Sequence, residues 1–297
     1  MKREERRPTT AVRTATLRRR ASAHRLNFRL LPSAFPLQPF ALSLLLLLPG
    51  LPAVSYAQRQ ADQRPLPMDP AQAKAEARVL VAGLLAQKPE QSSTNTGQVR
   101  IRDRDGKEVE IPARFQIIRA STNWLSVYET LNPADGPDQA KLVVIHTDNQ
   151  PNRYRLIERG NPATTNASLR ELTPAQTMIP FAGSDFWVAD LGLEFLHWPE
   201  QRLLRKEMRH SKFCSVLESS TPQPVPGGYS RVVSWVITES PHGIVHADAY
   251  DDRNELIKVF DPVNLEKVGG DYQLAEVEMR NRKTGSHTWI KFDVARE

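Results

Sequence analysis

From residue 97 onward, apolar and polar residues alternate with a period of two in most of the chain. This period is typical of half-buried β-strands. Turn-forming pairs such as Asp-Gly and Asn-Pro separate the alternating stretches, so the connections between them are short. Because parallel neighbours need a long crossover, short connections predict antiparallel pairing. The pattern predicts about ten strands in one meandering sheet, within residues 99–103, 107–120, 122–131, 140–148, 152–160, 202–219, 229–240, 243–252, 255–261, 273–283 and 287–294.

One helix is predicted before the strands, at residues 70–87. Asp69 stands at its N-cap, Pro70 at its first position, and Pro89 follows as a stop signal. Apolar residues recur within it at spacings of three and four, which predicts one stripe packed against a core. This stripe consists of Ala73, Ala77, Leu80, Val81, Leu84 and Leu85.

A second helix is predicted in the aromatic-rich stretch TMIPFAGSDFWVADLGLEFLHWP, residues 177–199. With Ser184 as N-cap, a helix over 184–198 would be apolar on all sides except one narrow arc, formed by Asp190, Glu194 and His197. A surface helix would carry a wider polar side. Two interpretations remain open: a helix packed permanently in the core, or a removable cover that exchanges its contacts for those of a ligand. Gly192 lowers the local helix propensity by about 1 kcal/mol, which suits a mobile element.

The two helices are needed to complete the predicted fold. A strongly twisted sheet with one apolar face does not stay flat and open in water, so it must curl or be covered. Only the segments 70–87 and 184–198 are available to cover it. The sequence therefore predicts a mostly β (α+β) fold, in which a large curved antiparallel sheet carries helices on its concave face.

Residues 1–57 have the composition of a signal peptide with a long basic front. Ten of the 40 Lys and Arg residues lie there, against two of the 34 Asp and Glu residues, and an apolar run at 40–51 follows. That run is shorter than the roughly 20 residues of a spanning helix, which makes a membrane anchor the weaker interpretation. The arginines at 18–20 suggest twin-arginine export, but the next residues lack the apolar pair, which favours general secretion. We predict a cleaved signal peptide at 1–57, a linker at 58–68 and one exported domain at 69–297.

Removal of the leader changes what the charge of the chain indicates. The formal net charge of the whole chain is +6, but residues 58–297 hold 30 basic and 32 acidic residues. The basic charge that would bind nucleic acid is thus lost with the leader, and nucleic acid is not expected as a partner. The single cysteine, Cys214, excludes an intrachain disulfide, and its apolar surroundings favour a buried small side chain over a reactive thiol.

The chain offers little catalytic chemistry. It lacks a Gly-x-Ser-x-Gly elbow, a His-Glu-x-x-His motif and a phosphate-binding glycine loop. Ser184 is better explained as a helix cap. Four residues could be imagined as metal ligands, but a metal site needs more groups at defined geometry, and residues 251–254 and 283–286 are better explained as hairpin turns. These four are His246, Asp248, Asp251 and Asp252. We expect no catalytic residue, no metal, no cofactor and no enzyme activity.

The C-terminal half of the chain resembles the outer-membrane lipoprotein-sorting proteins, the LolA-like group. The runs that carry this resemblance are FAGSDFWVADL, KEMRHSKFCSVLES, YSRVVSWV, AYDDRNELIKVF and EVEMRNRKTGSHTWIKF, within residues 175–294. The Gly-Ser-Asp-Phe followed shortly by Asp-Leu is the most specific part. The resemblance implies an open, incomplete antiparallel barrel whose mouth is filled by helices, and a periplasmic protein that carries acyl chains.

These observations together predict a periplasmic carrier that shelters the acyl chains of lipoproteins or lipids in an apolar cavity during transit to the outer membrane. Inner- and outer-membrane transport proteins are possible partners. The residues expected to line the cavity are Trp124, Phe186, Trp187, Leu193, Leu196 and Trp235. Two alternatives remain: a periplasmic sensor or interaction module of the same fold that binds a protein partner, and a hydrolase that uses Ser184 or His246.

Overall fold

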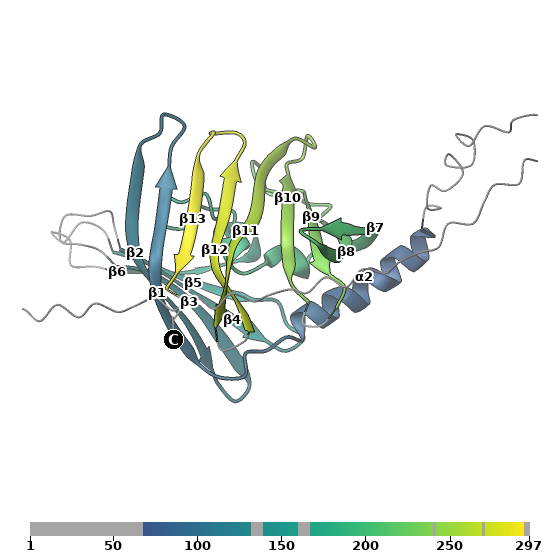
Figure 1. Ribbon diagram of the computed structural model, residues 1–297, viewed down its shortest axis with the longest axis horizontal. Coiled ribbons are helices and arrows are strands. Elements are labelled where there is room, and N and C mark those ends of the chain that lie inside the picture. Colours follow the sequence, from purple (N-terminus) through teal and green to yellow (C-terminus); the bar gives the residue numbers. More distant parts are fainter. Residues whose placement is uncertain (1–67, 132–138, 160–166, 240–241, 269–270, 294–297) are drawn as a thin grey trace, which may run out of the picture. The chain divides into compact units, whose positions relative to one another are not determined.

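The computed structural model describes residues 68–131, 139–159, 167–239, 242–268 and 271–293 (Figure 1). All of them lie within one compact unit, residues 64–297. The predicted signal peptide and the linker up to residue 67 lie outside the described residues. None of the helices in the described ranges is long and apolar enough to cross a membrane.

The described chain is dominated by a single sheet of thirteen strands. Every strand pair is antiparallel. The strands are β1 (Ser93–Arg102), β2 (Glu108–Arg119), β3 (Asn123–Thr130), β4 (Gln139–Thr147), β5 (Arg153–Arg159), β6 (Ala167–Leu172), β7 (Glu200–Arg209), β8 (Lys212–Ser220), β9 (Arg231–Ile237), β10 (Ile244–Tyr250), β11 (Leu256–Val268), β12 (Asp271–Asn281) and β13 (His287–Phe292).

The order of the strands divides the sheet into two meanders. Strands β1 to β6 follow one another on one side and β7 to β13 on the other, and the two halves join where β1 pairs with β13 (Figure 1). In this junction Val99 lies between Ile290 and Ile111, which places three apolar side chains on one face. Strands β6 and β7 are the two edges and do not pair with each other. The prediction of one large, unclosed antiparallel sheet is confirmed.

Two details of the strand prediction need correction. The alternating run 202–219 is two strands, because His210 and Ser211 have φ values of 48° and 60° and form the turn between β7 and β8. The short strand β6 was not predicted. The hairpin turns predicted at 251–254 and 283–286 are confirmed, since Asp251 accepts hydrogen bonds from the backbone of Arg253 and Glu255, and β12 and β13 flank the second turn.

The predicted N-terminal helix is present as α2 (Pro70–Leu85). The Asp69 carboxylate accepts hydrogen bonds from the backbone N–H groups of Ala71 and Gln72, which confirms the expected cap. Of the predicted stripe, Ala73, Ala77 and Val81 are buried, Leu80 and Leu84 are half-buried, and Leu85 is exposed. The helix packs against the second meander, as the salt bridge of 3.2 Å between Glu76 and Lys206 of β7 also shows.

The two faces of the sheet have different partners. One face, which we name the covered face, carries Leu142, Leu156, Leu217 and Ile290, all of which belong to clusters that include residues from outside the sheet. The opposite face, the outer face, carries a smaller apolar cluster of Cys214, Val216, Val233 and Trp235. Cys214 is fully buried there, as its surroundings in the sequence predict.

The second predicted helix, 184–198, is wrong as a single element. The structure has a four-residue helix α3 (Val188–Leu191) and a 3-10 helix η2 (Glu194–His197), separated by Gly192 and by Leu193, whose φ is 50°. Ser184 does not cap a helix. Its hydroxyl donates to the Phe186 carbonyl and accepts from the Phe186 N–H, which closes a tight turn. A left-handed backbone at a leucine is strained, so tertiary contacts must hold this break in place.

Candidate ligand-binding site

The chain passes from the first meander to the second through residues 173–199, which we name the connecting segment. It leaves edge strand β6, passes through η1 (Pro174–Gln176), α3 and η2, and enters the other edge strand, β7. On the way it lies against the covered face and contributes side chains to all three apolar clusters there. These buried side chains are Phe181, Phe186, Val188, Phe195 and Leu196.

The connecting segment touches both halves of the sheet. The Tyr128 hydroxyl of β3 donates to the Leu191 carbonyl at 3.1 Å, and Thr288 of β13 accepts from the Asp185 N–H at 2.9 Å. Phe186 packs with the β1, β2, β12 and β13 side chains, whereas Val188 packs with those of β4 and β5. A segment this short reaches all these strands only because the sheet curves around it. The expectation that this stretch covers the concave face is thus confirmed, although the single helix is not.

Asp185 forms the first of three polar anchors between the connecting segment and the sheet. Its carboxylate accepts hydrogen bonds from the hydroxyls of Thr288 and Ser286 and from the amide of Asn281, at 2.9, 2.6 and 3.1 Å. Asp185 is only 7% exposed. Because a buried carboxylate needs such donors, these bonds fix the middle of the segment against β12, β13 and the turn between them.

The second anchor is an ion pair between Lys258 of β11 and Asp190 of α3. The Lys258 Nζ lies 3.6 Å from Asp190 Oδ2 and donates to the Asp185 carbonyl at 2.5 Å, and the side chain is 2% exposed. The ammonium also lies 3.7 Å from the centre of the Trp187 ring, which stacks on Tyr229. Burial lowers the pKa of Lys258 to about 8 although the Asp190 carboxylate opposes this shift. Burial likewise raises the pKa of Asp190.

The third anchor holds the break between α3 and η2. The Tyr154 hydroxyl of β5 donates to the Glu194 carboxylate at 2.6 Å, and the Asn152 amide donates to the Gly192 carbonyl at 2.7 Å. Tyr154 and Glu194 are 0% and 3% exposed, and burial raises the pKa of both groups. Two residues of the narrow polar arc noted in the sequence, Asp190 and Glu194, thus face partners in the sheet.

Gly192 is required by this third anchor. A Cβ atom on it would lie 2.3 Å from the Tyr154 hydroxyl and 2.5 Å from the Tyr154 ring. We expect Gly192→Ala to lower the free energy of unfolding by about 1–3 kcal/mol, as overpacking does elsewhere. Urea denaturation followed by tryptophan fluorescence would measure this loss. The matched control is Gly243→Ala, where a Cβ meets only one atom, at 3.9 Å. An equal effect of both substitutions would contradict a role for close packing at Gly192.

Four of the six residues predicted to line a cavity lie on the covered face or against it. Phe186 and Leu196 are buried in the apolar clusters, and Trp187 packs beside them. Trp124 pairs in register with His146, with which it stacks at 3.7 Å. Ser126 and Tyr128, which alternate with Trp124 along β3, place it on the covered face. Their role as a lining stays a prediction.

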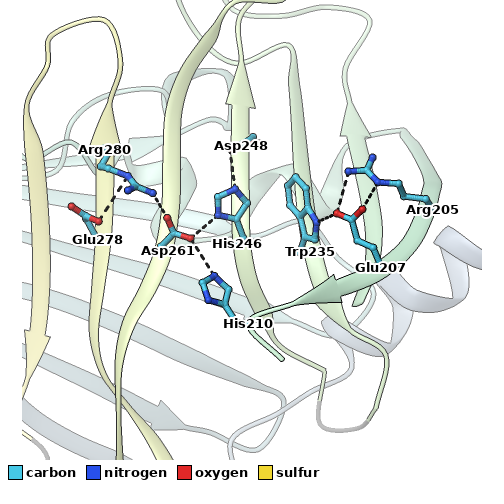
Figure 2. Close-up of polar contacts among 9 residues, drawn as sticks. All are labelled: Arg205, Glu207, His210, Trp235, His246, Asp248, Asp261, Glu278 and Arg280. Carbon is cyan, nitrogen blue, oxygen red and sulfur yellow. Dashed lines mark hydrogen bonds and ion pairs between the residues drawn. The ribbon is translucent and has the colours of Figure 1, made fainter. Parts of the chain in front are cut away.

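The other two predicted lining residues lie elsewhere. Leu193 is 42% exposed at the break between α3 and η2. Trp235 belongs to the outer face, where its Nε1 donates to Glu207 (Figure 2). Arg205 and Arg209 lie over its ring at 5.8 and 5.1 Å. Trp235 therefore does not share a surface with the four residues on the covered face, and the alternation of β9 gave no indication of which side was covered.

The outer face also carries His246 and Asp248, two of the four residues considered as metal ligands, whereas Asp251 and Asp252 lie in the turn after β10. His246 donates from Nδ1 to Asp261 at 2.6 Å and lies 3.1 Å from Asp248 through Nε2, while Asp261 is also bound by Arg280 (Figure 2). His246 and Asp248 share a strand face, as predicted, but both imidazole nitrogens are occupied. Within the described ranges no group of three or more His, Cys, Asp or Glu could hold a metal ion. Ser184 and His246, considered for a hydrolase, lie on opposite sides of the sheet.

Sequence reasoning missed Asp185, Tyr229 and Lys258 as members of the site. One signal for Lys258 was present in the sequence ELIKVF, where it alternates with Phe260 and so occupies the phase that faces the core. A charged residue at a core position of a strand indicates a buried partner. The identity of that partner depends on the fold, because Asp190 is 68 positions away along the chain and meets Lys258 only through the path of the connecting segment.

Comparison with known proteins agrees with this fold. A DUF1329 family protein from Desulfovibrio piger aligns with a TM-score of 0.57 and 19% identity, over 77% of this chain and 96% of the other. An outer-membrane lipoprotein-sorting protein domain from Vibrio parahaemolyticus aligns with a TM-score of 0.60 and 16% identity, over 76% of this chain and 92% of the other. At these identities the likeness concerns the fold, and it confirms the LolA-like architecture that the sequence runs indicated.

In sequence, no curated protein matches the chain. A protein-family model, described as an uncharacterized protein, matches residues 126–296, which is more than half of the 297 residues. The match begins within β3 and includes the whole connecting segment and the second meander. The chain therefore belongs to this family of proteins, and it has the fold of the outer-membrane lipoprotein-sorting proteins.

Proposed function

We propose that the protein is a periplasmic carrier that shelters acyl chains of lipoproteins or lipids against the covered face during transit to the outer membrane. The observation that carries this proposal is the position of the connecting segment, which supplies buried apolar side chains to every cluster of the covered face. The residues 1–57 serve in this proposal as a cleaved signal peptide, and residues 69–297 form the single carrier domain. Transport proteins of the inner and outer membranes would load and receive the cargo.

Exposure of an acyl chain to water has a large free-energy cost. Each exposed methylene costs about 0.8 kcal/mol, so a chain of about sixteen carbons would cost about 13 kcal/mol in aqueous transit. The covered face already keeps an apolar surface dry by packing it against the connecting segment. Replacement of that segment by an acyl chain buries a similar apolar area before and after the exchange. Loading and release are then both possible, because neither state exposes a large apolar surface.

The proposal predicts that protein exported in its native host and purified without detergent carries lipid, identified by mass spectrometry after solvent extraction. Lipid-free protein in repeated preparations would count against a carrier. One stoichiometric protein partner without lipid would instead favour a sensor or interaction module.

Thiol labelling separates displacement of the connecting segment from general unfolding. In a Cys214→Ser background, palmitate added below its micelle concentration should make Leu196→Cys react faster with a maleimide. The matched control is Val236→Cys in β9, which belongs to the same apolar cluster and is equally buried but lies in the sheet. It should stay protected, since only the connecting segment moves. Equal acceleration at both positions would mean that lipid unfolds the protein, and would contradict the exchange.

A further inference from the structure

The acceptors of the Lys258 ammonium are provided by the connecting segment. Nζ donates to the Asp185 carbonyl at 2.5 Å and pairs with the Asp190 carboxylate at 3.6 Å. Trp187, whose ring covers the ammonium at 3.7 Å, belongs to the same segment. Lys258 itself lies in β11, so displacement of the segment removes these contacts while the ammonium remains on the covered face.

A second donor on the sheet side shares this dependence. The Tyr229 hydroxyl donates to Asp190 Oδ2 at 3.1 Å, the same oxygen that pairs with Lys258. Tyr229 is 2% exposed and precedes β9. One carboxylate oxygen of the segment thus satisfies both an ammonium and a phenol that belong to the sheet half of the site.

The Asp185 anchor repeats the arrangement with neutral donors. Thr288, Ser286 and Asn281 all direct hydrogen bonds to its carboxylate. Two sets of donors thus face the connecting segment, one that includes the Lys258 ammonium and one that is wholly neutral, and both are occupied by carboxylates of the segment. Apolar acyl chains cannot replace these two acceptors, because methylene groups accept no hydrogen bonds.

We propose that the cargo is an anionic amphiphile, whose carboxylate or phosphate takes the place of the Asp190 carboxylate on Lys258 and Tyr229. This inference rests on the proposed carrier function and specifies its substrate class. Removal of the partner of a buried cation strongly destabilises a protein, whereas an anionic oxygen of the ligand at the same place would restore the ion pair with Lys258. A head group with several acceptor oxygens would in addition satisfy the donors that surround Asp185.

Matched pairs of probes that differ only in charge test the proposal. Dansyl-aminoundecanoic acid and its methyl ester carry the same chain and fluorophore, so their dissociation constants report the contribution of the carboxylate. Oleoyl lysophosphatidic acid and monoolein, used as competitors, do the same for the phosphate. We expect the charged member of at least one pair to bind the lipid-free protein about tenfold more tightly. The pair with the larger ratio identifies the head group as a carboxylate or a phosphate.

Two variants assign the preference to Lys258. Lys258→Met combined with Asp190→Asn leaves no unpaired charge in the closed protein and keeps an acceptor for Tyr229, so it should fold. We expect it to bind the charged and neutral probes within about twofold of each other. Asp190→Asn alone keeps the ammonium and removes its competitor, so it should bind the charged probes more tightly than the unaltered protein does.

The outcomes distinguish this inference from the carrier function itself. Equal binding of charged and neutral probes by the unaltered protein, or a preference that survives in the double variant, would overturn the inference and leave a carrier of neutral acyl chains. Binding of none of the probes would overturn the carrier function and the inference with it.

Discussion

Replacement of Lys258 by methionine is expected to lower the free energy of unfolding by about 3–5 kcal/mol. Methionine has a similar length, so the loss comes mainly from the Asp190 carboxylate, whose side chain is only 11% exposed and would be left without its cation. Asp190 has a raised pKa even with Lys258 present. The variant should therefore be more stable at mildly acidic pH, where Asp190 binds a proton, than at neutral pH. Urea denaturation at the two pH values would measure both effects.

Two comparisons show whether the charge is responsible. The second substitution Asp190→Asn, added to Lys258→Met, should recover most of the loss, because it removes the unpaired carboxylate and keeps an acceptor for Trp187 and Tyr229. Lys88→Met is the matched control, since the Lys88–Asp148 pair is close, at 2.6 Å, but exposed. It should cost less than about 1 kcal/mol. A double variant as unstable as Lys258→Met would show that packing, and not the ion pair, holds this anchor.

The connecting segment makes two kinds of contact with the sheet, which have different consequences for the proposed exchange. Its apolar contacts, through Phe186 and Leu196, are of a kind that an acyl chain can also make. Its polar contacts, through Asp185 and Asp190, are of a kind that such a chain cannot make. In the exchange that we propose, an acyl chain would replace the apolar contacts, and the polar contacts would select the ligand.

The fold could largely be predicted from the sequence because its determinants are local. The alternation of period two and the turn residues define antiparallel neighbours, and each turn connects strands that pair with each other. The pairing of β1 with β13 brings together the first and the last strand of the described chain. No sequence pattern near either strand predicts this pairing. Strand β6, with the sequence ASLREL, has few apolar residues because it is an edge strand, and its alternation is correspondingly weak.

The site was less predictable, because it depends on which face of the sheet is covered. Trp235 and Val236 are adjacent in β9 and both are buried, yet only Val236 faces the connecting segment. A strand buried on both faces gives no signal of orientation. The break at Leu193 was also hidden, since a left-handed leucine contradicts local preference. The break is imposed by the close contact of Gly192 with Tyr154, which lies in β5 of the first meander.

On the outer face, replacement of His246 by phenylalanine is expected to lower the free energy of unfolding by about 3 kcal/mol at pH 6. The imidazole bonds two carboxylates, Asp261 at 2.6 Å and Asp248 at 3.1 Å, and hydrogen bonds to charged groups contribute about 1.5–3 kcal/mol each. His246 is 5% exposed, so water replaces these bonds poorly. His287→Phe is the matched control, because His287 is half-buried and contacts a single carboxylate, that of Glu278. This substitution should lower the free energy of unfolding by less than His246→Phe does.

The dependence of this effect on pH follows from the two pKa shifts. Burial alone would lower the pKa of His246, but its bonds to Asp248 and Asp261 outweigh burial and raise it above 6.5. Burial would raise the pKa of Asp261, but His246 and Arg280 lower it below 3.8. The contribution of His246 is therefore complete below pH 6.5 and is lost as the pH rises through its raised pKa. That of the Asp261 carboxylate is present above pH 3.8 and is lost as the pH falls through its lowered pKa. The difference in the free energy of unfolding between the protein and His246→Phe should thus be largest between about pH 3.8 and pH 6.5 and shrink on both sides. A difference that grows above pH 6.5 would instead show that the imidazole stabilises the sheet in its neutral form.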